Sequence, residues 1–559
     1  MKHRPILFLA LTLSLLISPV RFTPGAAAGW QTVATGVEYQ KFQLNDPNNV
    51  FVARMDRSMA NLAIESALGD GRVGGRETMS DMARRYDGTI NFWKATWGNR
   101  NRVAVAINGS YFDWYTGKIF GGQIHSGWYA KRFRDCETGS GGSGFAFKLD
   151  GSVFMGGTVS HPASKQTATF LSDGGEYQEF QGINVSRDND ELILYTPQYG
   201  SSTGTDSSGS EVLVELQQPS LVTTDMVVGK VVDVRKDAGS TPIPFDHVVL
   251  SAKGSAENRL LNYADEGDEI GISHKIKSYV SGCGSSQADE IDWENTYASV
   301  DGAFYFLKAG QIRDFPDDGG ATARNPRTAV AYNDSYIFFI VVDGRDKEHS
   351  RGMTIRQLAE FARNELKASY GIAQDGGGSS TMVVNGVVVN NTYCNNVDCD
   401  KQRLEGGSFG PEDLERRDTR QPPQISADGV PLTEEYFSYS PDASGVAILQ
   451  RLVANGLMIV RIEPKTTSSN FVPQEQVAIR EAAAVLLGPG NNYEAFATAD
   501  GGQLATISEH SLNGVKAGNS FWWKVRLQAA GQQVTGWLAE QDLFSNHLDE
   551  IINIPLIRQ

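Results

Sequence analysis

The feature that most constrains the fold is a strand, helix and strand run in the second half of the chain. Ile337–Val342 is apolar throughout, which predicts a strand buried on both faces. It leads directly into Asp343, and Thr354 with Gln357 then forms the capping box of an amphipathic helix. A short strand ends at Asp375. If the two strands are parallel and adjacent, Asp343 and Asp375 lie on one edge of the sheet.

The loop after the second strand has the composition of a binding loop. Asp375 is followed by three glycines, two serines and a threonine, and the next segment has the type I′ hairpin signature Asn385-Gly386. Glycine allows positive φ and close approach of the backbone to a ligand. Free N–H groups in such a loop can hold an anion, so we expect a phosphate or sugar-phosphate site here.

The length of 559 residues predicts more than one domain. The expected fold is an α+β catalytic domain, a mixed sheet with flanking helices, which carries an all-β insertion and precedes a small all-β barrel. Residues 448–462 are interpreted as the last helix and strand of the catalytic domain. The expected divisions are a signal peptide at 1–28, the catalytic domain at 29–464 with its insertion at about 151–277, a linker at 465–473, and a C-terminal domain with its tail at 474–559.

The charge balance excludes a general nucleic-acid binder. Lys plus Arg is 50 against 66 for Asp plus Glu, giving a net charge of -16. Affinity for nucleic-acid phosphates depends on clustered Lys and Arg, so no nucleic-acid partner is expected. Any phosphate site must therefore be local.

The N-terminus has the parts of a secretory signal. A basic start at Met1–Arg4 precedes an apolar run from Pro5 to Val20, and three alanines end at Ala28. Cleavage after Ala28 would leave a secreted protein of the extracellular space or cell envelope, without a membrane span. The alternative is an uncleaved anchor, although the apolar run is short for a span.

Four cysteines suit such an oxidising compartment. Cys394 and Cys399 are close enough to pair, which leaves Cys136 for Cys283, although the sequence permits three connectivities. A zinc site is the alternative interpretation, but the spacing is not CxxC and no His pair accompanies it.

Two further segments are candidate parts of a site. Asn108–Asp113 is a polar and aromatic cluster after the apolar strand Val103–Ile107, and its alternative interpretation is a simple turn. Ala323–Val330 places two arginines around a turn that a proline fixes. His125 is interpreted as a hydrogen-bonded loop residue rather than a catalyst.

Four motifs are Asn108–Asp113, Asn325–Val330, Asp343–Arg345 and Asp375–Ser379. Together they resemble the phosphodiester glycosidase family, in the family's order, over roughly residues 30–464. Gln374, Ser110 and Ala331 depart from the family pattern.

The C-terminal segment, with Gly488-Pro489-Gly490 and Trp522-Trp523, resembles a bacterial Src-homology-3-like domain, whose members often bind cell-wall peptides or glycans. The alternative role of those aromatic residues is the core of a small barrel.

The resemblance implies hydrolysis of a sugar C1–O bond whose leaving group is a phosphate monoester. The substrate would be a sugar phosphodiester such as an N-acetylglucosamine-1-phosphodiester of a cell-surface glycan or exopolysaccharide. Asp375 and Asp343 would act on the anomeric centre while Arg327 or Arg345 holds the phosphate. The implied substrate-binding residues are Asn108, Gly109, Tyr111, Asp113, Arg345, Gly376, Gly377, Gly378 and Ser379.

No cofactor and no metal-binding residues are expected. The alternative is a divalent ion near Asp113 or Asp343, which no ligand spacing strongly supports. The rival hypothesis is a secreted, non-catalytic protein that binds phosphoglycans or the cell wall. A pocket that holds both Asp and Arg favours catalysis, because binding an anion does not require a carboxylate.

Overall fold

The computed structural model describes residues 29–94, 96–134, 144–155, 157–216, 218, 226–279, 291–302, 304–315, 318–392, 403–404, 437–445 and 447–545. The predicted signal segment and all four cysteines lie outside these residues, so both expectations stay predictions. No helix in the described ranges has the length and apolar character needed to cross a bilayer.

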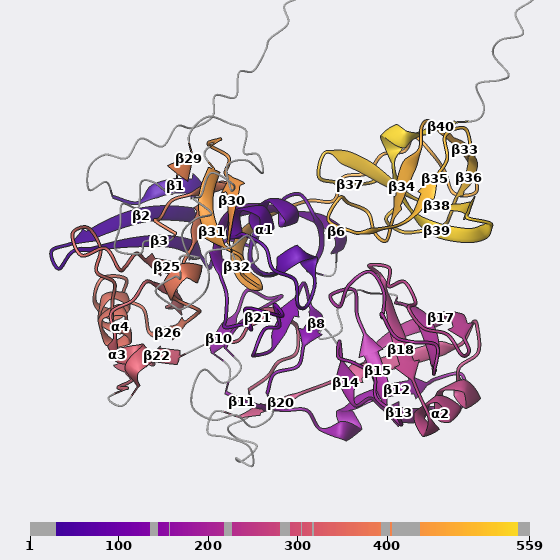
Figure 1. Cartoon of the computed structure of the whole chain (residues 1–559), viewed down its shortest axis with the longest axis horizontal. Coiled ribbons are helices and arrows are strands. Elements are labelled where there is room, and N and C mark those ends of the chain that lie inside the picture. Colours follow the sequence, from indigo (N-terminus) through magenta and orange to yellow (C-terminus); the bar gives the residue numbers. More distant parts are fainter. Residues whose placement is uncertain are drawn as a thin grey trace, which may run out of the picture.

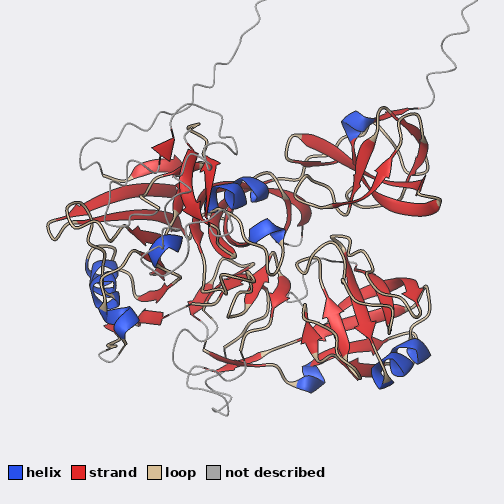
Figure 2. Ribbon diagram, in the orientation of Figure 1, coloured by secondary structure: helices blue, strands red, loops and turns tan. Residues whose placement is uncertain are grey.

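The predicted α+β class with flanking helices is wrong, because strands dominate every part of the described chain (Figures 1 and 2). Four α-helices occur within the described residues, and none exceeds ten residues. The helices are α1 (Met79–Tyr86), α2 (Ser255–Tyr263), α3 (Gly319–Thr322) and α4 (Ile355–Asn364).

The catalytic region is built on two large sheets. The first has the order β1-β2-β3-β25-β24-β26-β22-β23, and the second has the order β28-β27-β6-β32-β4 with β5 paired to β6. The first comprises β1 (Gln31–Ala34), β2 (Val37–Leu44), β3 (Asn48–Asp56), β22 (Phe304–Lys308), β23 (Gln311–Ile312), β24 (Arg327–Tyr332), β25 (Tyr336–Val342) and β26 (Tyr370–Ala373). The second comprises β4 (Leu62–Leu68), β5 (Ile90–Trp93), β6 (Thr96–Asn108), β27 (Met382–Val384), β28 (Val387–Val388) and β32 (Asn455–Glu463).

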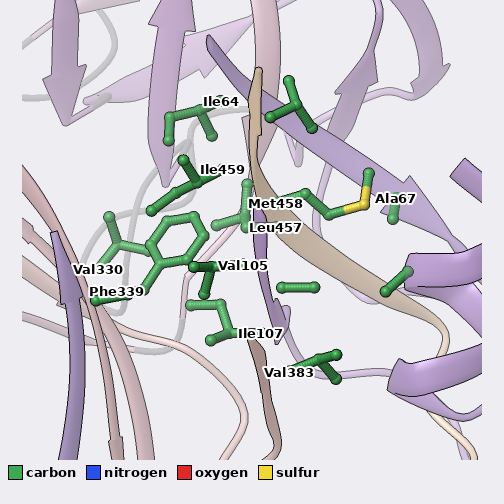
Figure 3. Packing of buried hydrophobic residues seen from close by; sticks show 14 of the residues in the cluster. Ile64, Ala67, Val105, Ile107, Val330, Phe339, Val383, Leu457, Met458 and Ile459 are labelled. Carbon is green, nitrogen blue, oxygen red and sulfur yellow. The ribbon is translucent and has the colours of Figure 1, made fainter. Parts of the chain in front are cut away.

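The main core lies between these two sheets. Val330 and Phe339 of the first sheet pack with Val105, Ile64 and Ile459 of the second (Figure 3). All five are buried, and successive side chains along a strand point to opposite faces. A second sheet therefore covers the face of the first sheet for which a helical layer had been expected.

The opposite face of the first sheet packs on helices α3 and α4. Phe338, Ile340 and Val342 of β25 belong to the same buried cluster as Leu358 and Ala362 of α4. The apolar run of β25 was thus correctly predicted to be buried on both faces. The predicted capping box of α4 is also confirmed, with Thr354 and Gln357 bonding reciprocally.

The strand order brings three predicted site residues to one edge. Strand β24 lies between β25 and β26 and pairs antiparallel with both. Strands β25 and β26 are therefore parallel to each other but not adjacent. Asp343 and Asp375 follow their carboxyl ends, and Arg327 begins β24 at the same edge. The expectation that the two aspartates flank adjacent strands is wrong, because an arginine-bearing strand separates them.

Residues 448–462 form two strands, and the helix predicted there does not occur. The physical reason is the sheet pairing of each apolar half: β31 (Ala447–Arg451) pairs with β29 (Arg403–Leu404) and β30 (Phe437–Pro441), while β32 pairs with β4 and β6. Local apolar periodicity cannot reveal those distant partners.

Three further groups of strands complete the described fold (Figure 1). A five-stranded sheet beside the main core consists of β7 (Gln123–His125), β8 (Trp128–Lys131), β9 (Phe145–Lys148), β10 (Val153–Met155) and β21 (Thr296–Val300). The inserted strands are β11 (Thr158–Ser160), β12 (Gln166–Phe170), β13 (Glu176–Glu179), β14 (Gly182–Ile183), β15 (Leu192–Tyr195), β16 (Ser210–Leu216), β17 (Val227–Arg235), β18 (His247–Ala252), β19 (Glu269–His274) and β20 (Lys277–Tyr279). The C-terminal strands are β33 (Gln476–Ile479), β34 (Ala483–Leu486), β35 (Ala495–Ala499), β36 (Leu504–Ile507), β37 (Val515–Ala517), β38 (Ser520–Ala529), β39 (Gln532–Ala539) and β40 (Leu543–Ser545).

Candidate active site

Asn108 joins the second sheet to the site edge of the first. Its Nδ2 donates to the carbonyl of Asp375 at 2.8 Å, and its Oδ1 accepts from Thr328 Oγ1 at 2.7 Å and from the Thr381 N–H at 3.2 Å. Asn108 is 1% exposed, so these bonds are shielded from water. The side chain therefore fixes the end of β6, the start of β24 and the glycine loop relative to one another.

The glycine loop packs too tightly for larger residues. A Cβ on Gly376 would lie 2.7 Å from the Pro326 carbonyl oxygen, and one on Gly378 would lie 2.7 Å from Arg451 Nη2. Gly377, at φ +63°, begins the 3₁₀ turn Gly377–Ser379 and donates its N–H to Pro326 at 3.0 Å. Because Gly377 and Ser379 both donate to protein carbonyls, these two amides are not available to an anion as expected.

Asp375 is held in a buried polar chain. Its Oδ2 accepts from Ser379 Oγ at 2.6 Å, and that hydroxyl in turn accepts from Arg451 Nη1 at 3.3 Å. Asp375 is 7% exposed and Ser379 is fully buried. These two hydrogen bonds orient the Asp375 carboxylate and link it, through the Ser379 hydroxyl, to the positive charge of Arg451.

Arg451 was missed from the sequence because residues 448–462 were interpreted as scaffold. It ends β31, is 4% exposed, and its guanidinium carbon lies 5.5 Å from the centre of the Trp114 ring. A signal was present: the polar pair Gln450-Arg451 stands between apolar residues at Ile448-Leu449 and Leu452-Val453. Such a residue, buried by its neighbours, usually has an anionic or polar partner.

Asp343 is the second buried carboxylate, at 3% exposure. Its Oδ1 accepts from Asn390 Nδ2 and from the N–H of Asn391, each at 3.1 Å. Asn390 Nδ2 also donates to the Ser380 carbonyl at 2.9 Å. Asn390, which the sequence analysis did not select, therefore ties Asp343 to the glycine loop.

Arg327 is a buried cation between the two aspartates along the sheet edge, at 7% exposure. It donates to three carbonyls, those of Met353 at 2.9 Å and of Gly320 and Ala323 at 2.7 Å each. Among the described residues, no carboxylate forms an ion pair with it.

The surroundings of Arg327 also leave it charged. Burial lowers its pKa to about 10, with Tyr111 raising it, Arg345 lowering it and Asp318 raising it to smaller extents. The guanidinium therefore stays protonated at neutral pH. A buried positive charge whose direct hydrogen-bond partners are all carbonyl groups is suited to an anionic ligand.

The other predicted residues surround this cluster with different roles. A Cβ on Gly109 would lie 2.5 Å from Asn455 Oδ1, which explains the glycine. Tyr111 is 41% exposed, and Arg345, at φ +65°, donates to Asn325 Oδ1 at 3.2 Å. Asp113 accepts from the N–H groups of two residues of its own turn, and these bonds lower its pKa. Its contacts are those of a turn-stabilising residue.

His125 lies away from the sheet edge, with Nδ1 2.8 Å from the Ser66 carbonyl oxygen. It lines a separate cavity between the catalytic region, the insertion and the C-terminal strands. His125 was expected in a loop and instead ends strand β7, although it is hydrogen-bonded as expected.

One group of possible metal ligands occurs within the described residues, formed by Glu215, Asp246 and His510. Its ligand atoms lie within 4.8 Å of one another. Lys524 Nζ already lies 2.9 Å from Glu215 Oε1 and 3.5 Å from Asp246 Oδ2. The ammonium group supplies the positive charge that these carboxylates require, so the donor set does not fit an additional metal ion.

Comparison with protein families confirms the predicted resemblance over part of the chain. Residues 225–404 match the family model of phosphodiester glycosidases. This range contains Arg327, Asp343 and Asp375, whereas Asn108 and Arg451 lie outside it. The Src-homology-3-like character of the C-terminal strands is not confirmed and stays a prediction.

No curated protein matches the chain by sequence. Among solved structures, a hypothetical protein from Synechocystis is similar at 13% identity and a TM-score of 0.42, covering 76% of this chain and 62% of that one. A protein of Burkholderia pseudomallei K96243, described as exported, has 18% identity and a TM-score of 0.40, with 74% of each chain covered.

A third similar structure is the catalytic domain of zebrafish N-acetylglucosamine-1-phosphodiester alpha-N-acetylglucosaminidase, auto-inhibited by its pro-peptide. Its identity is 13% and its TM-score 0.28, with 78% of this chain and 86% of that chain covered. The chain thus spans less than two thirds of the Synechocystis protein but most of the zebrafish domain.

Proposed function

We propose that the chain is a glycosidase that hydrolyses the sugar C1–O bond of a sugar-1-phosphodiester. The family match at residues 225–404 supports a phosphodiester glycosidase. The more specific proposal rests on the sheet edge, where two buried aspartates flank a buried arginine without a carboxylate partner among the described residues.

The observation that carries the proposal is the environment of Arg327. Its three carbonyl contacts hold the guanidinium in place but do not neutralise it. A phosphodiester carries one negative charge and presents two oxygens that a guanidinium can bind bidentately. Arg345 lies close enough to lower the pKa of Arg327, so two cations share this part of the site.

The carboxylates would act on the sugar rather than on the phosphate. Asp375 or Asp343 would stabilise or attack the positively charged anomeric carbon as the C1–O bond breaks. The phosphate monoester leaves with the bonding electron pair, and water supplies the new C1 hydroxyl and a proton. A phosphate leaving group lowers the need for a strong general acid, so a second group that protonates the departing oxygen is less important than in ordinary glycosides.

Binding without catalysis is the alternative function, and the two carboxylates argue against it. Asp375 and Asp343 place negative charge at the edge that also holds Arg327. Such a charge weakens the binding of an anion and is useful when positive charge develops on a sugar. Measurable affinity for sugar phosphodiesters with no release of free sugar would establish the binding function instead.

The substrate is proposed to be an N-acetylglucosamine-1-phosphodiester or a related diester of a cell-surface glycan or exopolysaccharide. Secretion is proposed on the basis of the N-terminal segment, which has the composition of a signal peptide. The C-terminal strands are proposed to contact cell-wall glycan or peptide. Fractionation of cells that express the full chain would test secretion directly.

The experiment that tests the role of Arg327 is its conservative replacement by lysine. Arg327→Lys keeps the charge but loses bidentate binding, so kcat/KM for a sugar-1-phosphodiester should fall by about 100-fold. The matched control is Arg324→Lys in the same turn, because Arg324 is partly exposed and pairs with Asp46 outside the site. Equal kcat/KM in both variants would remove the phosphate-binding role from Arg327.

A further inference from the structure

A short hairpin beside the candidate active site carries an exposed pair of aromatic side chains. It covers residues 111–120 and is closed by an antiparallel bridge between Phe112 and Ile119, which are both buried. The N–H of Phe120 donates to the Tyr111 carbonyl at 2.9 Å, so these two residues lie opposite each other. Tyr111 is 41% exposed and Phe120 is 45% exposed. Because opposite residues place their side chains on one face, the two rings form a single exposed surface.

This concentration of aromatic side chains is unusual for the surface of the chain. Eight large hydrophobic residues are exposed in the part of the chain that the structure describes, and four of them are aromatic. Three of the four, Tyr111, Tyr115 and Phe120, belong to the hairpin, whereas Tyr177 lies on β13 of the insertion. Single exposed hydrophobic residues are ordinary, but a group of them beside a site indicates a binding surface.

Two contacts attach the hairpin to the buried polar chain of Asp375. The N–H of Asp375 donates at 2.9 Å to the carbonyl of Gly109, two residues before Tyr111. Within the hairpin, the Trp114 ring centre lies 5.5 Å from the guanidinium carbon of Arg451, which belongs to the same polar chain. The exposed rings are therefore held at a fixed position next to the site edge.

The aromatic pair also lies near the proposed phosphate position. Burial lowers the pKa of Arg327 to about 10, and Tyr111 is the strongest of the influences that raise this pKa. The phenol of Tyr111 is thus close to the guanidinium. Because Arg327 would hold the phosphate, the group on the other ester oxygen of the phosphate would lie within reach of the hairpin.

Positive charge surrounds the aromatic pair. The Phe120 carbonyl accepts from Lys131 Nζ at 3.1 Å and from Arg134 Nε at 3.3 Å, and the Arg134 guanidinium carbon lies 6.0 Å from the Phe120 ring centre. Burial lowers the pKa of Lys131 to about 8. Arg134 and Lys118 lower this pKa further and Asp301 raises it, so three cations lie near one carboxylate. Aromatic rings among cations suit a sugar of a phosphate-linked glycan, which has an apolar face and anionic substituents, better than a hydrocarbon chain.

We propose that Tyr111 and Phe120 form a leaving-group subsite, which binds the sugar attached to the far side of the phosphate in a phosphate-linked glycan. The apolar face of this sugar would pack on the exposed rings, while the sugar to be released lies at the two aspartates. The subsite makes the enzyme selective for glycan diesters over diesters of simple alcohols or lipids. This inference rests on the proposed function, because it takes the phosphate to lie at Arg327.

The test compares three diesters of N-acetylglucosamine 1-phosphate, whose leaving alcohols are methanol, octanol and the primary hydroxyl of methyl glucoside. The wild type should have a kcat/KM for the glucoside diester about tenfold above that for either alkyl diester. Phe120→Ala should reduce this preference to about twofold or less, since it removes one ring of the subsite. The preference is a ratio within each variant, so differences in the amount of folded protein cancel.

The matched control is Tyr177→Ala. Tyr177 is 49% exposed, similar to Phe120, but lies on the insertion outside the candidate site. This control should keep the preference of the wild type. A preference that Phe120→Ala leaves unchanged would overturn the proposal, as would a wild type that prefers the octyl diester or treats all three diesters equally. Each of these outcomes includes turnover and so leaves the proposed function intact.

Failure of the wild type to hydrolyse any of the three diesters would instead contradict the proposed function. Titration calorimetry with glucose 6-phosphate then decides the subsite without turnover. Phe120→Ala should bind glucose 6-phosphate about tenfold more weakly than the wild type and should bind inorganic phosphate equally. Equal affinity of both proteins for glucose 6-phosphate, or no saturable binding to the wild type, would overturn the subsite.

Discussion

The candidate active-site edge and the junction of the insertion with the C-terminal strands both bury charged groups, but they compensate them differently. At the junction, Asp246 is fully buried and contacts His247 Nδ1 at 2.6 Å and His510 Nε2 at 3.1 Å, with Lys524 Nζ at 3.5 Å. At the active-site edge, Arg327 has only carbonyl partners among the described residues.

A buried charge that the protein compensates itself stabilises the fold, whereas a buried charge without a charged partner can bind a ligand. The junction cluster of Glu215, Asp246, His247, His510 and Lys524 satisfies its own charges and joins two parts of the chain. The active-site edge leaves a positive charge for a ligand to neutralise. Substitutions at the edge should therefore change activity more than stability, and substitutions at the junction should do the opposite.

The largest effect is expected for Asp375→Asn. Replacing the carboxylate by an amide of similar shape removes the negative charge next to the anomeric carbon, so kcat should fall by about 1,000-fold or more. The midpoint of urea unfolding should change little, because the amide oxygen can still accept from Ser379. Turnover at the wild-type rate would exclude Asp375 from the mechanism.

Asp246→Asn should give the opposite pattern. Replacing the buried carboxylate takes a charged acceptor away from His247, His510 and Lys524, and the free energy of unfolding should fall by about 3 kcal/mol. The control is Asp46→Asn, whose partners Arg324 and Arg351 are partly exposed and whose loss should cost less than about 1 kcal/mol. Both variants should retain kcat in conditions where they are folded.

A smaller, pH-dependent effect should follow from the same cluster. Burial is the largest single influence and raises the pKa of Asp246, but His247, His510 and Lys524 together outweigh it and hold this pKa well below its ordinary value. A depressed folded-state pKa contributes stability in full above the unfolded-state pKa, which is about 3.9. This contribution is lost as the pH falls toward the folded-state pKa.

The measurement is the difference in free energy of unfolding between wild type and Asp246→Asn as a function of pH. This difference should be constant above about pH 5 and shrink by up to about 1.4 kcal/mol per pH unit below about pH 4. A difference that stays constant down to about pH 2.5 would contradict a depressed pKa at Asp246.

Local patterns in the sequence predicted the parts of the fold that short segments determine. The helix cap at Thr354, the buried strand at Ile337–Val342 and the turn at Asn385-Gly386 were all read from neighbouring residues. The apolar faces of β25 revealed burial but not what covers them. A second sheet covers one face, and its strands come from both ends of the catalytic region.

The site was predictable where its motifs are contiguous and not where distant strands contribute. Asp343 and Asp375 were expected at one sheet edge and lie there together with Arg327, although the position of β24 between β25 and β26 depends on long-range pairing. Arg451 and Asn390 reach the cluster from segments without a recognisable motif. Their roles depend on contacts that no short stretch of sequence specifies.

The most direct test of the central claim is hydrolysis of a sugar-1-phosphodiester in water enriched with oxygen-18. Cleavage of the C1–O bond, with carboxylates acting on the sugar and Arg327 holding the phosphate, places the label in the C1 hydroxyl of the released sugar. Mass spectrometry of the sugar and of the phosphate monoester distinguishes the two bonds, with the spontaneous exchange of free sugar as the control. Label in the phosphate monoester would show P–O cleavage and contradict the account.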